Sequence, residues 1–271
     1  GITLNLKHPD GLALFRRMVA KADVVVENYR PDVKDRLGIG WEALAAVNPR
    51  IVLGSISGFG QHGPYAGRPG FDQIAQGMGG LMSVTGLPGG GPVRAGIPVA
   101  DLTAGLYCAL GILVALLERE ATGRGRWVHT SLLEAMVAMM DFQATRWTMA
   151  GEVPGQAGND HPTTTPTGLF RTRDGIVNLA GGGAEMWRRI VGTLGIAEQA
   201  RDPDMATDAL RSRHRVKVNA LLQSVLETRT TEEWVRALNA AGVPCGPVYS
   251  MDQVFADEQV RHLGLAWPVP H

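Results

Sequence analysis

The chain has 271 residues, enough for one large domain or two ordinary ones at roughly 100–200 residues per domain. Lys plus Arg and Asp plus Glu each total 26, so the formal net charge is zero and no basic field exists to hold a nucleic acid. Apolar residues make up 45% and charged residues 19%, a balance typical of a globular chain and not of a disordered one.

The cysteines and the apolar segments indicate the setting of the protein. Cys108 and Cys245 lie far apart and form no C-x-x-C or metal-binding spacing, which predicts a reduced, cytoplasmic environment. The longest apolar stretch, residues 102–117, is shorter than the ~20 residues that span a bilayer, so we expect a buried helix and no membrane association. The first residues do not resemble a signal peptide, and we expect the chain to begin within a longer protein.

Helix and strand patterns alternate at the start of the chain. Apolar residues recur at helical spacing over residues 10–22 and 41–47, and a short apolar run follows each segment, at 24–26 and 51–53. Such short runs predict buried strands. The alternation predicts an α/β fold with a parallel sheet.

Glycine and proline then interrupt the chain and predict two loops, 57–70 and 86–98. The other elements expected in this part are a helix over 71–84, a long helix over 101–122, a strand over 126–129 and a helix over 131–149.

Beyond residue 150 the composition changes. Gly, Pro, Asn and Thr replace periodic apolar residues over 151–166, which predicts a linker. Residues 168–180 predict a hairpin that turns at Asp174-Gly175, because this pair supplies the positive φ of a tight turn. The remaining elements expected are helices at 184–195, 212–227 and 231–241 and a last strand near Val248.

Gly58 to Gly63 match the G-x-G-x-x-G fingerprint of dinucleotide-binding proteins. Pro64, Gly67 and Pro69 follow, however, and prevent the helix that this fingerprint requires. We therefore expect a ligand-facing loop and no nicotinamide site.

Asp101 opens the long predicted helix and has two interpretations. As an N-cap its side chain would accept a backbone N–H. Alternatively, the helix amino terminus favours the ionised carboxylate, which could attack an activated acyl group. Spacing leaves both open.

Two further segments have a ligand-binding and a purely structural interpretation. Gly181, Gly182 and Gly183 could offer backbone N–H groups to an oxyanion or could form a permissive strand-to-helix connection. Asn28 and Tyr29, with Arg30 and Arg36, follow a predicted strand, where arginines could bind phosphate or be solvated. The histidines show no metal-ligand spacing, so no metal site is predicted.

A set of short motifs follows one another along the chain: Glu27-Asn-Tyr-Arg-Pro, Asp35-Arg-Leu-Gly, Asn48-Pro-Arg-Ile, Ser57-Gly-Phe-Gly-Gln, Arg68-Pro-Gly-Phe-Asp, Thr85-Gly, Val99-Ala-Asp and Glu118-Arg-x-x-Thr-Gly-Arg-Gly. In this order they resemble the class III CoA-transferases, the CaiB/BaiF family. The resemblance is dense from residue 1 to about 137 and looser to the end.

The resemblance implies roles for the candidate residues. Asp101 matches the family's catalytic aspartate, which attacks an acyl-CoA thioester to give a mixed anhydride, recaptures CoA as an aspartyl-CoA thioester and passes it to an acceptor carboxylate. Asn28, Tyr29 and Arg36 match CoA-contacting positions, and Gly181–Gly183 resemble a glycine loop over the active site. The resemblance implies CoA as a substrate, with no permanently bound cofactor and no metal.

Departures from the family pattern bear on the reaction. The racemase branch has a His where Phe71 stands, so 2-methylacyl-CoA racemisation is disfavoured, and Phe71 and Asp72 are left as substrate-pocket residues. His129 stands where members commonly carry Asp, with an expected local effect. A racemase-like enzyme and a CoA-binding module without turnover remain as alternatives, and no residue pattern identifies the acyl donor or acceptor.

The resemblance also implies an architecture. We expect a Rossmann-like large domain over 1–150, a linker over 151–166, a small α+β domain over 167–250 and a return linker over 251–271. The family forms interlocked homodimers, and the chain corresponds to the middle of a longer family member, so its CoA pocket is expected to be incomplete.

Overall fold

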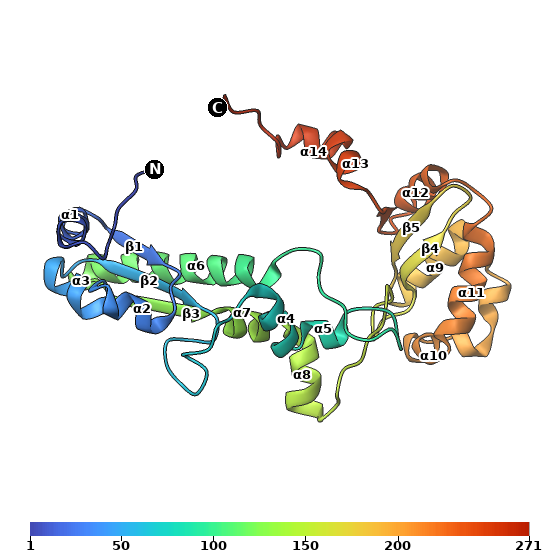
Figure 1. The fold of residues 1–271 in the computed structure, drawn as a ribbon. Helices are drawn as coiled ribbons and strands as arrows, with labels where there is room; N and C mark the ends of the chain where they lie inside the picture. Colours follow the sequence, from blue (N-terminus) through green and yellow to red (C-terminus); the bar gives the residue numbers. More distant parts are fainter. Residues whose placement is uncertain (271) are drawn as a thin grey trace. The chain divides into compact units, whose positions relative to one another are not determined.

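The computed structural model describes residues 1–270 (Figure 1). The chain divides into two compact units, Gly1–Gln156 and Ala157–His271. Each unit has its own sheet and its own core.

The first unit is built on a three-stranded parallel sheet. Its strands are β1 (Val24–Glu27), β2 (Val52–Ser57) and β3 (Trp127–Ser131), in the order β1-β2-β3. The parallel sheet predicted from the alternation of helix and strand patterns is confirmed, and with it the α/β class.

The helices of the first unit surround this sheet. They are α1 (Pro9–Val19), α2 (Pro31–Arg36), α3 (Trp41–Val47), α4 (Asp72–Met78), α5 (Leu81–Val84), α6 (Val99–Thr122), α7 (Leu132–Met139) and α8 (Asp141–Ala150).

The helices differ from the sequence prediction in three places. The six-residue α2 was not expected, because it is too short to show an apolar period. The helix predicted over 71–84 is two helices, since Gly80 has a φ of 92° and redirects the backbone. The helix predicted over 131–149 is likewise divided at Asp141, whose φ is 44°.

Helices cover both faces of the parallel sheet. Leu53 packs with Val19 and Leu44 from the α1 and α3 side, while the adjacent Val52 packs with Cys108 and Ile112 of α6. Successive β2 residues thus point to opposite faces, as the period of a strand requires. This double burial explains the apolar run 51–53 at the start of β2.

The long helix α6 is buried on one side only. By length and composition alone, its 24 residues would suffice to cross a membrane, yet its inner face packs on β2, β3, α4 and α7. The prediction of a buried helix was wrong for the other side: Leu102, Leu106, Leu110, Leu113 and Leu117 are all exposed, Leu117 by 74%. Their spacing of three and four residues places them in one apolar stripe, here called the α6 leucine stripe.

The second unit contains an antiparallel sheet of β4 (Thr167–Arg171), β5 (Ile176–Ala180) and β6 (Cys245–Pro247). The predicted hairpin is confirmed, but its turn geometry was wrong, because neither Asp174 nor Gly175 has a positive φ. The longer turn is closed by the N–H of Thr172, which donates to the carbonyl of Gly175 at 2.9 Å. Asp174 accepts a further bond from the N–H of Thr231 at 2.8 Å.

Helices pack on this sheet around Ile190, Leu222 and Trp234, all buried against Val177 and Leu179. They are α9 (Ala184–Leu194), α10 (Asp208–Arg213), α11 (Arg215–Leu226) and α12 (Thr231–Ala240), with short 3-10 turns at Gln199–Arg201 and Pro203–Met205. The segment expected as a return linker carries two short helices, α13 (Met251–Ala256) and α14 (Glu258–His262).

Candidate active site

The carboxyl ends of the parallel strands meet at one edge of the sheet, where open α/β folds bind ligands. A pocket of about 320 Å³ lies there. Its lining combines predicted site residues with strand-end residues: Asn28, Ile56, Ser57, Gly58, Gly70, Phe71, Asp101 and Leu132. The fold thus gathers Asn28, Phe71 and Asp101, which are dispersed along the sequence.

Asp101 lies in the first turn of α6, but it does not cap the helix. The helix begins at Val99 and its N-cap is Pro98, which has no polar side chain to offer. Among the described residues, no hydrogen bond or ion pair engages the Asp101 carboxylate. The N-cap interpretation is therefore wrong, and Asp101 lines the pocket with its carboxylate unpaired.

The surroundings of Asp101 raise the pKa of its carboxyl group. Partial desolvation in the pocket is the larger cause, and the negative charge of Asp72 adds to it. Both effects oppose the helix amino terminus, which favours the ionised form. A carboxylate with a raised pKa is a stronger base and nucleophile once it is ionised.

Asp72 was predicted to line the substrate pocket together with Phe71. Phe71 does line it and is 78% exposed, whereas Asp72 is buried and is not among the lining residues. The Oδ1 atom of Asp72 accepts the N–H of Ala100 at 2.9 Å, and its Oδ2 atom accepts from Gln76 at 2.8 Å and Arg94 at 3.3 Å. Asp72 therefore contacts the start of α6 from behind the pocket.

The G-x-G-x-x-G segment forms a loop, and no helix follows it before α4. Gly58 and Gly70 lie back to back in the pocket wall, where a Cβ atom on either would lie 2.8 Å from the Cα of the other. Because Gly58 lines the pocket, the structure agrees with the ligand-facing interpretation of this loop and not with the dinucleotide-binding one.

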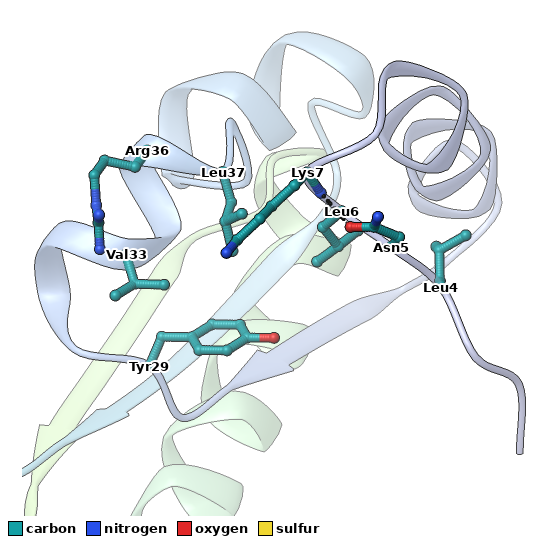
Figure 2. Close-up of a pocket in the computed structure, with 8 residues that line it drawn as sticks. All are labelled: Leu4, Asn5, Leu6, Lys7, Tyr29, Val33, Arg36 and Leu37. Atoms are coloured by element: carbon teal, nitrogen blue, oxygen red, sulfur yellow. Dashed lines mark hydrogen bonds between the residues drawn. The ribbon is translucent and has the colours of Figure 1, made fainter.

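A second and larger pocket of about 650 Å³ contains the predicted residues Tyr29 and Arg36 (Figure 2). Its other lining residues are Leu4, Asn5, Leu6, Lys7, Val33 and Leu37. In Figure 2 the Lys7 side chain extends into this pocket above the Tyr29 ring. An aromatic face with two cations suits a ligand that carries a planar ring and phosphates.

A narrower hollow of about 60 Å³ shares residues with both pockets. Asn28 and Gly58 belong to it and to the Asp101 pocket, while Tyr29 belongs to it and to the larger pocket. Arg30 and Arg68 complete its wall. The three hollows are therefore neighbours that share lining residues, Asn28 and Gly58 on the Asp101 side and Tyr29 on the other.

Gly181–Gly183 connect β5 to α9 in the second unit. The N–H of Gly181 already donates to the Pro166 carbonyl at 2.7 Å, and a Cβ atom there would collide with Ile190. Within residues 1–270, no hydrogen bond engages the N–H of Gly182 or of Gly183. Only these two N–H groups of the loop are left for a ligand.

Lys7 and Asn5 were missed by sequence reasoning. The alternation Leu4-Asn5-Leu6-Lys7 is a short period-two pattern that favours one face for both polar side chains, although in the structure Leu6 and Lys7 lie in a turn. That signal indicates a shared face, but it does not say that the face borders Tyr29.

Comparison with known proteins places this site in a family. The family model described as CoA-transferase family III matches residues 1–271. The chain belongs to CoA-transferase family III. This family III chain is 38% identical over 264 residues to succinate–glutarate CoA-transferase of Agrobacterium fabrum, a match that covers 97% of the chain and 66% of that relative.

Two other matches agree with this assignment. Acetyl-CoA:oxalate CoA-transferase of Acetobacter aceti is 37% identical over 248 residues, which is 91% of the family III chain and 64% of that protein. The crystal structure of a CaiB/BaiF family protein from Brucella suis superposes with a TM-score of 0.85 at 36% identity, over 97% of this chain and 70% of the other. The chain thus spans less than two thirds of the length of these curated relatives.

Proposed function

We propose that the protein transfers CoA from an acyl-CoA thioester to a carboxylic acid, with Asp101 as the nucleophile. The observation that carries the proposal is the unpaired carboxylate of Asp101 in a pocket that shares Asn28 and Gly58 with the hollow beside Tyr29. Tyr29 in turn lines the larger pocket of the Arg36 and Lys7 cations. The names of the two curated relatives, both CoA-transferases, support this reaction class.

The proposed reaction needs only carboxylates and a thiolate. An Asp101 oxygen attacks the thioester carbonyl, the carbon–sulfur bond breaks, and CoA leaves as the thiolate while a mixed anhydride forms. The thiolate then attacks the Asp101 carbonyl carbon of the anhydride, releasing the donor acid and leaving an aspartyl-CoA thioester. The acceptor carboxylate attacks this thioester to form a second anhydride, and the returning thiolate takes the acceptor acyl group and frees Asp101.

The larger pocket is proposed to hold the nucleotide part of CoA. Its volume of about 650 Å³ lies within the ~300–1,000 Å³ usual for small-molecule sites. The adenine would stack on Tyr29, and Arg36 and Lys7 would bind phosphate. Asn28 would contact the arm of CoA that leads to Asp101. CoA is thus proposed as a substrate, without a permanently bound cofactor.

The glycine loop is proposed to assist acyl transfer. Among the described residues, no hydrogen bond engages the N–H groups of Gly182 and Gly183, and donors of this kind bind oxyanions in other acyl transfers. Gly181 is left out of this role because its N–H is already bonded to Pro166.

The organisation of the protein is also a proposal. We take the first unit as a Rossmann-like large domain and the second as a small α+β domain, in a cytoplasmic homodimer. The α6 leucine stripe supports a partner surface, because solvent-facing helices of α/β proteins are normally polar.

Mass spectrometry after incubation with acyl-CoA and hydroxylamine tests the nucleophile. We expect a hydroxamate on the peptide that contains Asp101 when succinyl-CoA, acetyl-CoA or oxalyl-CoA is the donor. Asp101→Ala should lose the adduct and more than about 1,000-fold of the transfer rate while retaining CoA binding. Asp10→Ala, an exposed carboxylate elsewhere, is the matched control. CoA binding without any adduct would support the module without turnover and overturn the transferase proposal.

A further inference from the structure

The segment that leads into α6 is tied to α4 by side chains of that short helix. Gln76 is fully buried on α4, and its Oε1 atom accepts the N–H of Ala95 at 3.0 Å. Its Nε2 group donates to the carbonyl of Ile97 at 3.2 Å and to the Oδ2 atom of Asp72 at 2.8 Å. The Gln76 amide thus hydrogen-bonds the backbone of the segment at Ala95 and Ile97, and it orients the carboxylate of Asp72.

That carboxylate completes the link to Asp101. Asp72 accepts the N–H of Ala100, which is one of the otherwise unpaired donors at the start of α6. The helix has no cap of its own, since its N-cap residue is Pro98. Asp72 therefore takes the place of the missing cap, and Gln76 holds Asp72 in the rotamer that reaches Ala100.

We infer that Gln76 is a positioning residue for Asp101: through residues 95–97 and through Asp72 it fixes the first turn of α6, and with it the direction of the attacking carboxylate. Gln76 does not line the Asp101 pocket, so it acts through other residues and not on the substrate. The inference rests on the proposed function, in which Asp101 must approach a thioester carbonyl in one orientation.

The position and burial of Gln76 argue against a role in packing alone. Gln76 is fully buried and makes three hydrogen bonds. If the site needed only a side chain that fills space, an apolar residue of the same size would fill it without the desolvation cost of burying an amide. All three of its partners lie on the route to Asp101, and none belongs to the apolar core around Ala104 and Met136.

The test compares Gln76→Met with Gln73→Met, which changes an exposed glutamine on the same helix. Methionine keeps the volume and removes the hydrogen bonds. We expect Gln76→Met to lower kcat and the rate of Asp101 hydroxamate formation by about 10- to 100-fold, with the KM for acyl-CoA changed less than about 3-fold. A kcat and an adduct rate equal to those of Gln73→Met would overturn the inference.

Hydrogen exchange gives a readout that does not need activity. In Gln76→Met the amides of Ala95 and Ala100 should lose protection by at least about 10-fold, while those of α7 keep it. If the parent chain forms no Asp101 adduct, the transferase proposal fails and this exchange pattern alone decides the inference. Unchanged protection at both amides would refute it.

A second variant covers the case in which Gln76→Met does not fold. Gln76→Asn keeps the amide but is one methylene too short to reach both Asp72 and Ile97. It should show the same loss of kcat with an unchanged KM, measured at a temperature at which both Gln76→Asn and Gln73→Met are folded, since the buried groups left unpaired lower the melting temperature of Gln76→Asn. A loss of melting temperature with an unchanged kcat would mean that Gln76 only stabilises the fold.

Discussion

The buried carboxylate of Asp72 accepts a hydrogen bond of 2.9 Å from the backbone N–H of Ala100, the residue that precedes Asp101. The bond gives α6 the cap that Pro98 cannot provide, and the carboxylate that accepts it brings a negative charge near the proposed nucleophile Asp101. Asp72 thus influences Asp101 both by geometry and by charge, and the two effects can be separated by substitution.

Asp72→Asn should move the pH dependence of transfer. Asn keeps an oxygen for the Ala100 N–H but removes the charge that helps to raise the pKa of Asp101. Because Asp101 must be ionised to attack, its protonation sets the acid limb of kcat/KM. A lower pKa shifts that limb to lower pH, which a pH–rate profile measures.

The control for this shift is Asp10→Asn, which removes an equal charge from an exposed site that does not line the Asp101 pocket. It should leave the profile unchanged. An acid limb that moves to higher pH in Asp72→Asn, or an equal movement in Asp10→Asn, would contradict the assigned effect of Asp72.

Gly58→Ala should destabilise the first unit. The new Cβ atom would lie 2.8 Å from the Cα of Gly70. Because both contacting groups belong to the backbone, relieving the clash requires a shift of the main chain. We expect a loss of about 1–3 kcal/mol in the free energy of unfolding, measured by denaturant titration.

Gly67→Ala lies in the same loop, where a Cβ atom meets nothing within 4 Å and φ is not positive. It should change the free energy of unfolding by less than about 0.5 kcal/mol. Equal stability of the two variants would show that the contact between Gly58 and Gly70 is not constrained.

Lys7→Ala should weaken CoA binding. A charge-assisted bond to phosphate contributes about 1.5–3 kcal/mol, so we expect Kd to rise by about 10- to 100-fold in calorimetry. The effect should shrink as salt is raised, because the pocket is open to solvent and its charges are screened.

Lys21→Ala removes the same charge from an exposed position outside this pocket and serves as the control. If both variants bind CoA like the parent chain, the larger pocket is not the nucleotide site. If both lose affinity equally, the effect is one of net charge.

The α6 leucine stripe should decide the oligomeric state. Replacing Leu106 and Leu113 with Gln removes apolar surface that solvent already reaches in the single chain, at 67% and 57% exposure. We expect the dissociation constant of the proposed dimer to rise by at least about 10-fold in sedimentation experiments, with little change in helical content.

The control is Leu87→Gln, which replaces an exposed loop leucine outside the α6 leucine stripe. It should leave the sedimentation behaviour as it is. A dimer that persists unchanged in the double variant would place the partner surface elsewhere.

The sequence by itself determined the elements whose signal lies within one segment. The apolar runs around Val25 and Leu53 and the alternation with helices predicted the parallel sheet, because a strand buried on both faces must be apolar throughout. The hairpin over 168–180 was also predicted locally, although its turn has another geometry than Asp174-Gly175 suggested. The motifs from Glu27 to Gly125 carried the family resemblance, since they depend on residue order alone.

Only the tertiary structure decided which residues act together. It placed Pro98 at the cap position that Asp101 could have held, buried Asp72 behind the pocket, brought Lys7 to Tyr29, and left one side of α6 exposed. None of these follows from a local pattern, because each depends on which segments, distant along the chain, pack against one another. The periodicity of a sequence predicts which side chains share one face of a helix or strand. Which of these faces lie against one another is decided by the packing of the whole unit.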